Sequence, residues 1–242
     1  MAVLKNVLSA TASILLLAVS WSCTQQANEN GFSRSDALQR IEQAVRSGDY
    51  GSIHAIVAIQ GGELQAEWYF EGEDERRGRD LGMVAFDRAT LHDLRSVTKS
   101  VVSLLLGIAI QQGAVAGVDE PVADFFQDYP EQLRPEHSEI RLRHLLSMTS
   151  GIRWDERTYP YTDSRNSETR MDLADDRTDL ILSEPAEARP GQRFNYSGGD
   201  VELIAQIIER ATDTDLVDFA LDELFTPLGI DELEWIDYRG TR

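Results

Sequence analysis

Hydrophobic and polar positions near the start of the chain follow two different periods. Over residues 35–48 the apolar side chains recur three or four residues apart, which predicts a helix. Residues 53–60 and 63–70 are rich in apolar and aromatic side chains and predict two strands. The Gly61-Gly62 pair between them is typical of a two-residue turn, so we expect an antiparallel hairpin.

Helical patterns dominate the rest of the chain. The stretch from Ser96 to Gly113 is apolar on all sides, which is typical of a helix in the middle of a protein. Residues 71–82, charged and glycine-rich, predict a loop, and the polar residues 153–175 predict a long irregular one of the kind that usually carries function. Further helices are predicted over 141–148, 198–213 and 215–230, the last ending near Pro227.

A strand hairpin followed by helices predicts an α/β (α+β) fold. The economical arrangement is an antiparallel sheet flanked by helices, with an inserted all-helical region. We expect one domain over residues 36–242, in which the sheet part covers 36–95 and the helical region about 96–190.

The first residues resemble an export signal. Lys5 is the only charge before an apolar run from Val7 to Val19, which is short for a membrane span, and small residues follow. The only cysteine, Cys23, stands where cleavage would leave it first, as in a bacterial lipoprotein. We therefore expect a signal peptide over 1–22 and a tether over 23–35. The protein would be exported, and either periplasmic or anchored to the membrane through a lipidated Cys23.

The charge of the chain argues against one class of partner. The 42 acidic residues outnumber the 23 basic ones, and the formal net charge is −19. Because the phosphates of nucleic acid would be repelled, we expect no nucleic-acid partner. The four histidines show no spacing typical of a metal site, and His144 reads as structural, so we expect no metal and no cofactor.

Ser96 and Lys99 form the first candidate for chemistry. Residues three apart lie on the same face of a helix, so the two side chains would meet near its N-terminus. Apolar surroundings disfavour a charged ammonium, and the helix N-terminus favours negative charge developing near Ser96. A neutral lysine beside a serine is a base beside a nucleophile. The alternative is that Ser96 caps the helix and Lys99 reaches to solvent.

Two further motifs favour the catalytic interpretation. Tyr196 lies in "RPGQRFNYSGG", and a leucine-rich helix ends in "TSG" at Gly151. Three motifs follow one another in the order S-x-x-K, T-S-G and P-G-x-x-F-x-Y-S. With these motifs, the chain from about Ile53 to Trp235 resembles the serine β-lactamase and penicillin-binding-protein superfamily. The likeness is closest to the class C β-lactamase-related esterases and amidases, including the 6-aminohexanoate-dimer hydrolase type.

The resemblance implies a role for each motif residue. Ser96 would be the acylated nucleophile, Lys99 its basic partner and Tyr196 the residue that moves protons. Taken alone, Tyr196 also fits a core aromatic. Gly198 stands where many relatives have an asparagine that helps bind the amide side chain of β-lactams, which argues against β-lactamase activity.

The expected function is that of a secreted serine hydrolase acting on a small-molecule ester or amide. A β-lactamase or D-alanyl-D-alanine peptidase, and a non-catalytic acyl-binding or sensor module or inactive fragment, remain alternatives. The resemblance also implies later strands, one bearing a K-T-G or H-x-G triad and a second oxyanion donor. No match follows Tyr196, so we expect a sequence truncated at its C-terminus.

The loop between the T-S-G motif and Tyr196 is where relatives carry a lid. We expect Trp154, Tyr159 and Tyr161 to contact substrate there, beside Gly198. The loop is rich in aspartate, so a site rimmed by it would favour cationic or neutral substrates over anionic ones. The alternative is that this segment is a solvent-exposed surface loop and not a lid.

Overall fold

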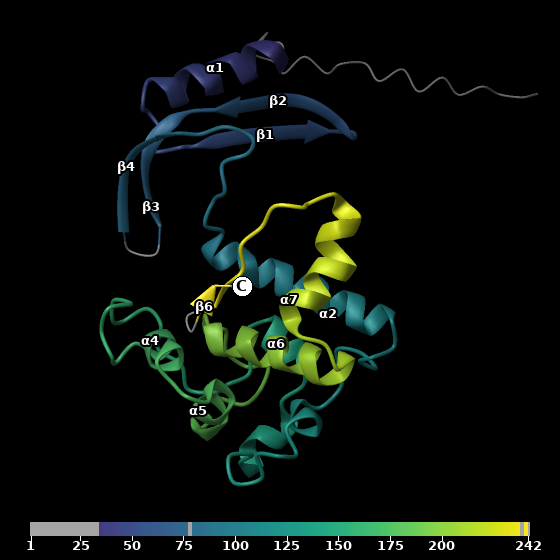
Figure 1. Ribbon diagram of the computed structural model, residues 1–242. Helices are drawn as coiled ribbons and strands as arrows, with labels where there is room; N and C mark the ends of the chain where they lie inside the picture. Colours follow the sequence, from purple (N-terminus) through teal and green to yellow (C-terminus); the bar gives the residue numbers. More distant parts are fainter. Residues whose placement is uncertain (1–33, 77–78, 238–239, 242) are drawn as a thin grey trace, which may run out of the picture. The chain divides into compact units, whose positions relative to one another are not determined.

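The computed structural model describes residues 34–76, 79–237 and 240–241. The described chain forms two compact units, which divide between Thr90 and Leu91 (Figure 1). The predicted signal peptide, and the tether up to residue 33 with Cys23, lie outside the described residues. Within the described part, none of the helices combines the length and apolar character that crossing a membrane requires.

The first unit consists of one helix and two hairpins. Helix α1 spans Arg34–Arg46 and is followed by β1 (Ala55–Gln60) and β2 (Glu63–Tyr69). These strands pair antiparallel, with an irregularity between Ala58 and Ile59. Both glycines of the connecting turn have positive φ, 60° at Gly61 and 82° at Gly62, as a type I′ turn requires. The predicted helix and hairpin are confirmed.

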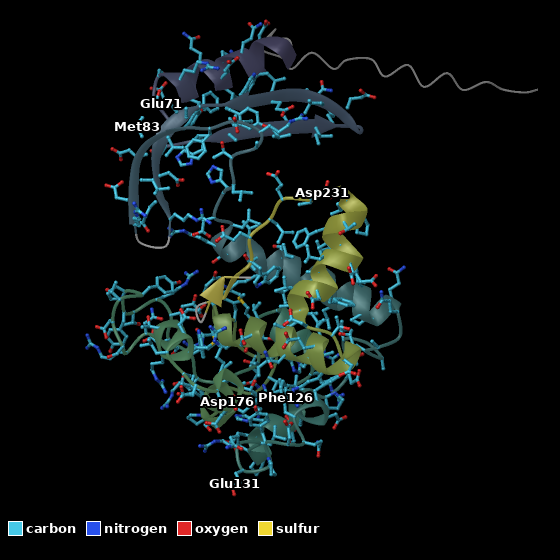
Figure 2. The ribbon with its side chains drawn as sticks, viewed as in Figure 1. Glu71, Met83, Phe126, Glu131, Asp176 and Asp231 are labelled. Atoms are coloured by element: carbon cyan, nitrogen blue, oxygen red, sulfur yellow. The ribbon has the colours of Figure 1, made fainter. Side chains whose placement is uncertain are left out.

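The prediction of a loop over residues 71–82 is wrong. Strands β3 (Glu71–Arg76) and β4 (Arg79–Ala85) form a second antiparallel hairpin, on which Figure 2 labels Glu71 and Met83. Most of their residues are exposed, so no apolar alternation marks them in the sequence. Backbone pairing forms the hairpin instead, and Gly72 lies so close to His54 that an added Cβ would come within 2.7 Å of its ring.

A small apolar core holds the first unit together. Val45 of α1, Ala66 of β2, and the aromatic residues Phe70 and Phe86 are buried. The rings of His54 and Phe86 stack at a centroid distance of 4.0 Å. Burial of these side chains joins the helix to both hairpins.

The second unit is mainly helical and contains the larger core. Its helices are α2 (Thr98–Gln111), α3 (Leu142–Leu146), α4 (Ser167–Asp172), α5 (Arg177–Ser183), α6 (Gly198–Thr212) and α7 (Leu216–Ala220), which continues as a π-turn over Leu221–Phe225. Short 3₁₀ turns occupy Arg95–Val97, Val122–Phe125, Pro135–Glu139 and Thr226–Leu228, and two-residue strands β5 (Ile236–Asp237) and β6 (Gly240–Thr241) pair near the end.

Helices α2 and α6 pack together at the centre of this unit. Leu105 and Ala109 of α2 and Ile207 and Ile208 of α6 are completely buried. Burial on α2 is confined to part of its surface, since Leu104 is 58% exposed. The prediction of a helix enclosed on all sides is therefore wrong for that face, although the predicted helices α2, α3, α6 and α7 are confirmed.

The long segment 153–175 is less irregular than predicted. Its second half contains α4, which begins after Asn166, and the Asn166 side chain accepts hydrogen bonds from the backbone N–H groups of Glu168 and Thr169. Helix α5 begins after Asp176, whose side chain caps Asp179 N–H in the same way. These caps satisfy backbone donors that a short helix cannot satisfy by itself.

Two leucines on α2 provide a test of this core. Leu105→Ala removes a fully buried side chain, and we expect it to lower the free energy of unfolding by about 2–5 kcal/mol. Leu104→Ala, at the exposed neighbouring position, should cost less than about 1 kcal/mol. Guanidinium denaturation of both variants measures the difference, and equal losses would contradict the described packing of α2.

Candidate active site

Ser96 lies in the 3₁₀ turn that leads into α2. The residue before it, Arg95, has a φ of 44°, a left-handed conformation that residues other than glycine rarely adopt. Its backbone N–H donates to the Asp93 carboxylate at 3.1 Å, which supports the turn. The serine is exposed at the start of the helix, and Lys99 follows one turn later, half-buried.

Tyr196 meets Ser96 across 100 residues of sequence. Its hydroxyl donates to Ser96 Oγ at 2.7 Å. Tyr196 lies immediately before α6, whose N-terminal cap is Ser197, with an Oγ that accepts from Asp200 N–H at 3.0 Å. Because α2 and α6 pack together, the serine at the start of one helix reaches the tyrosine at the start of the other.

Two basic side chains flank the Tyr196 ring. Lys99 Nζ lies 5.1 Å from the ring centroid, and the Arg157 guanidinium carbon also lies 5.1 Å from it. Contacts of this kind are favourable because the face of an aromatic ring is electron-rich. The structure thus brings the three predicted catalytic residues, Ser96, Lys99 and Tyr196, into one cluster within the second unit.

Glu156 connects the loop after the T-S-G motif to the start of α6. Its buried carboxylate accepts hydrogen bonds from Trp154 Nε1–H at 2.9 Å, from the Tyr161 hydroxyl at 2.9 Å and from Gly198 N–H at 2.8 Å. Three donors compensate the removal of this carboxylate from water. The loop is therefore attached to the segment that carries Tyr196.

Glu168 occupies the space beside Gly198. A Cβ added at Gly198 would lie 1.8 Å from Glu168 Oε2, so a larger residue there would displace the glutamate. Glu168 Oε2 is buried and accepts no hydrogen bond. Burial, together with the nearby charge of Glu156, raises the pKa of Glu168 to about 8, although Lys99 opposes that rise.

The three residues predicted to contact substrate differ in their surroundings. Trp154 is only 5% exposed and packs against Gly199, so it belongs to the core and presents no open face to a substrate. Its indole N–H donates to buried Glu156. Tyr159 stacks under Arg165, with the guanidinium carbon 4.2 Å from its ring centroid, and Tyr161 is 59% exposed.

Most aspartates of the loop form ion pairs or hydrogen bonds with neighbouring groups. Asp163 pairs with Arg165 at 2.6 Å, and Asp155 accepts from Thr158 N–H at 2.9 Å. Asp176, labelled in Figure 2, accepts from the Tyr129 hydroxyl at 2.9 Å. The carboxyl groups whose contacts reach Gly198 are instead Glu156 and Glu168, which were not among the predicted site residues. The glycine after Tyr196-Ser197 was the available signal, because it leaves space for another side chain.

A cavity of about 510 Å³ lies next to Lys99. Apolar side chains of α2, α3 and α6 form most of its wall, together with two serines: Ser100, Ser103, Leu104, Leu145, Leu146, Met148, Val201 and Ile204. In the described part of the chain, no group of three or more His, Cys, Asp or Glu side chains is arranged to hold a metal ion. His144 caps α3, accepting from Arg141 N–H at 3.1 Å.

Three known proteins are similar to large parts of this chain. Penicillin-binding protein 4* of Bacillus subtilis is 24% identical over 183 residues, which cover 73% of this chain and 36% of that protein. A penicillin-binding protein homologue from Pyrococcus abyssi superposes with a TM-score of 0.59 at 21% identity, covering 83% of this chain and 44% of the other. A Bacillus anthracis protein assigned as a 6-aminohexanoate-dimer hydrolase gives a TM-score of 0.54 at 18% identity, covering 74% and 45%.

These likenesses agree with the fold predicted from the motifs. The solved neighbours show the β-lactamase and penicillin-binding-protein fold, and the mixed helices and antiparallel hairpins described above conform to it. The chain spans less than half the length of each of these three proteins. A family model described as Beta-lactamase matches residues 38–239, which is most of the sequence, and the chain therefore belongs to the β-lactamase family.

Proposed function

We propose that this protein is a serine hydrolase that forms an acyl-enzyme on an ester or amide. The observation that carries the proposal is the 2.7 Å hydrogen bond between Tyr196 and Ser96, with Lys99 beside the same tyrosine ring. Such a cluster holds a nucleophile within reach of two groups that exchange protons. Membership of the β-lactamase family supports the same class of chemistry.

The proposed reaction has two steps. Ser96 Oγ attacks the substrate carbonyl while its proton passes to Lys99 through Tyr196, and the proton then reaches the leaving alcohol or amine. Water attacks the acyl-enzyme in the second step, and Ser96 regains its proton. The backbone N–H of Ser96, at the start of α2, would stabilise the negative oxygen that develops in each step.

The Gly198–Glu168 contact supports an esterase or amidase over a β-lactamase. The position that would carry an amide-binding asparagine has no side chain, and Glu168 fills the space. Hydrolysis of a p-nitrophenyl ester and of a chromogenic cephalosporin separates these functions. We expect ester hydrolysis that Ser96→Ala abolishes and little turnover of the cephalosporin. Faster hydrolysis of the cephalosporin, or ester hydrolysis that survives Ser96→Ala, would refute the proposal.

Substrate charge gives a second expectation. Residues 153–176 contain seven acidic side chains and four arginines, a formal charge of −3, which becomes −2 when Glu168 keeps its proton. Because this charge adjoins the site, an ester with a terminal amine should react faster than a matched ester with a terminal carboxylate, by about 3- to 10-fold in kcat/KM at low salt. The difference should shrink at high salt. A preference for the carboxylate would contradict an acidic rim and favour Arg157 as the dominant charge.

We also propose that the protein is exported and lipidated at Cys23. The signal-like first residues and the position of this single cysteine support the proposal. Cys23→Ser should move the protein from the membrane fraction to the soluble fraction, since the lipid anchor is lost. Fractionation followed by immunodetection measures this, with Ser96→Ala as the control that stays in the membrane. An unchanged distribution of the Cys23 variant would indicate secretion without lipid.

A further inference from the structure

The cavity beside Lys99 adjoins the candidate active site but has no part in the proposed reaction. Its volume of about 510 Å³ is in the range of sites that bind small molecules, and most of its wall is apolar. Lys99 belongs to both places. It lines the cavity, and its Nζ lies 5.1 Å from the ring centroid of Tyr196, whose hydroxyl donates to Ser96 Oγ.

The residue spacing on α2 places the cavity and Ser96 on the same face of the helix. The 3₁₀ turn that holds Ser96 runs directly into α2. The helix residues that line the cavity are Lys99, Ser100, Ser103 and Leu104. They follow Ser96 at intervals of three, four, seven and eight residues, which recur on one face of a helix. With a rise of about 1.5 Å per residue, these positions extend about 12 Å from the serine.

We propose that this cavity binds the acyl chain of the substrate, an uncharged aliphatic chain of up to about eight carbons. The inference rests on the proposed function, in which Ser96 becomes acylated. About eight C–C bonds of about 1.5 Å cover the 12 Å along the helix. Among the residues that line the cavity, Lys99 alone has an ionisable side chain, so the wall favours hydrocarbon over a charged group.

The course of the reaction assigns the cavity to the acyl group and not to the alcohol. The acyl carbon stays bonded to Ser96 Oγ until water attacks, so its chain remains beside the helix face that lines the cavity. The alcohol takes up a proton on the Tyr196 side, where the hydrogen bond between Tyr196 and Ser96 lies at an exposed position, and it leaves to solvent. Burial of the retained chain stabilises the transition states of both steps.

The test is a series of p-nitrophenyl esters with acetyl, butanoyl, hexanoyl, octanoyl and decanoyl groups. All release the same alcohol, so only the acyl chain changes, and each is measured below the concentration at which it aggregates. We expect kcat/KM to rise by about 2- to 4-fold per added methylene up to octanoyl and to level off at decanoyl, because burial of a methylene contributes at most about a factor of four. A rate that stays flat or falls from acetyl to octanoyl would overturn the inference.

Two substitutions on α2 change the cavity in opposite directions. Ser103→Phe places a ring in it, and the octanoyl-to-acetyl ratio of kcat/KM should fall by about tenfold or more, as expected when two or more methylenes stay unburied. Leu104→Ala removes the part of the α2 wall farthest from Ser96, so the decanoyl-to-octanoyl ratio should rise by about 2- to 4-fold. Both positions are exposed, and circular dichroism verifies folding.

Gln111→Phe is the matched control for Ser103→Phe. It adds the same ring at an exposed position of the same helix, outside the residues that line the cavity, and should keep the native octanoyl-to-acetyl ratio. If the folded Ser103→Phe protein also kept that ratio, or if Gln111→Phe lowered it equally, the inference would be wrong.

A second series exchanges the roles of the two parts of the ester. Acetate esters of ethanol, butanol, hexanol and octanol should show no rise of kcat/KM with chain length, because the alcohol leaves to solvent. A rise in this series that Ser103→Phe removes would place the alcohol in the cavity and overturn the inference, while the proposed function would stand. Ester hydrolysis that survives Ser96→Ala would instead refute the proposed function itself.

Discussion

Lys99→Arg should reduce kcat/KM for an ester by about 10²- to 10⁴-fold, the range that a general base contributes. The substitution keeps a long basic side chain beside Tyr196, whose ring centroid lies 5.1 Å from Lys99 Nζ. It removes the capacity to accept a proton, because a guanidinium stays charged at every accessible pH. The expected loss therefore separates a base from a cation that only packs on an aromatic ring.

The control for this substitution is Arg165→Lys, the reverse exchange at an exposed pair with Asp163. We expect it to change kcat/KM less than twofold, because surface ion pairs contribute little. Circular dichroism and thermal melting verify that both variants fold. A Lys99→Arg protein with near-native rates would remove the lysine from the proposed mechanism.

Tyr196→Phe should lower the rate of acylation by about 10²- to 10³-fold. The change deletes one oxygen, the one that lies 2.7 Å from Ser96 Oγ, and leaves the ring in place against Lys99. A group that transfers a proton in the transition state contributes about this much. Stopped-flow measurement of p-nitrophenol release separates acylation from the later hydrolysis of the acyl-enzyme.

Tyr129→Phe offers the matched control. It also deletes a tyrosine hydroxyl that donates to another side chain, Asp176 at 2.9 Å, but this pair takes no part in the cluster around Ser96. We expect its acylation rate to stay within about twofold of the native value. Equal effects of the two substitutions would mean that Tyr196 contributes only to packing.

Local signals in the sequence account for the parts of the fold that were predicted. The Gly61-Gly62 turn joins two apolar strands, and the periodic apolar residues of α6 bury one face, so both patterns are readable without knowledge of the tertiary structure. The hairpin of β3 and β4 was missed because its strands are polar and mostly exposed, and only cross-strand pairing defines it. Helix α4 was missed because six residues are too few for a helical periodicity to show.

The site also divides into residues that stand in sequence motifs and residues whose position depends on tertiary contacts. Ser96, Lys99 and Tyr196 stand in motifs with fixed spacing, and the structure brings them together. Glu156 and Glu168 lie in a loop with many acids, where sequence alone cannot tell a buried carboxyl group from a solvated one. The burial of Trp154 likewise depends on contact with α6, which the sequence does not reveal.

Covalent labelling tests directly whether Ser96 is the nucleophile. The chain is treated with a fluorophosphonate, digested and analysed by mass spectrometry, with Ser96→Ala and Ser100→Ala treated in parallel. We expect one added phosphonyl group on Ser96, lost in Ser96→Ala and retained in Ser100→Ala, which changes the next serine along the chain. A label on another serine, or a folded native chain that stays unlabelled, would contradict it.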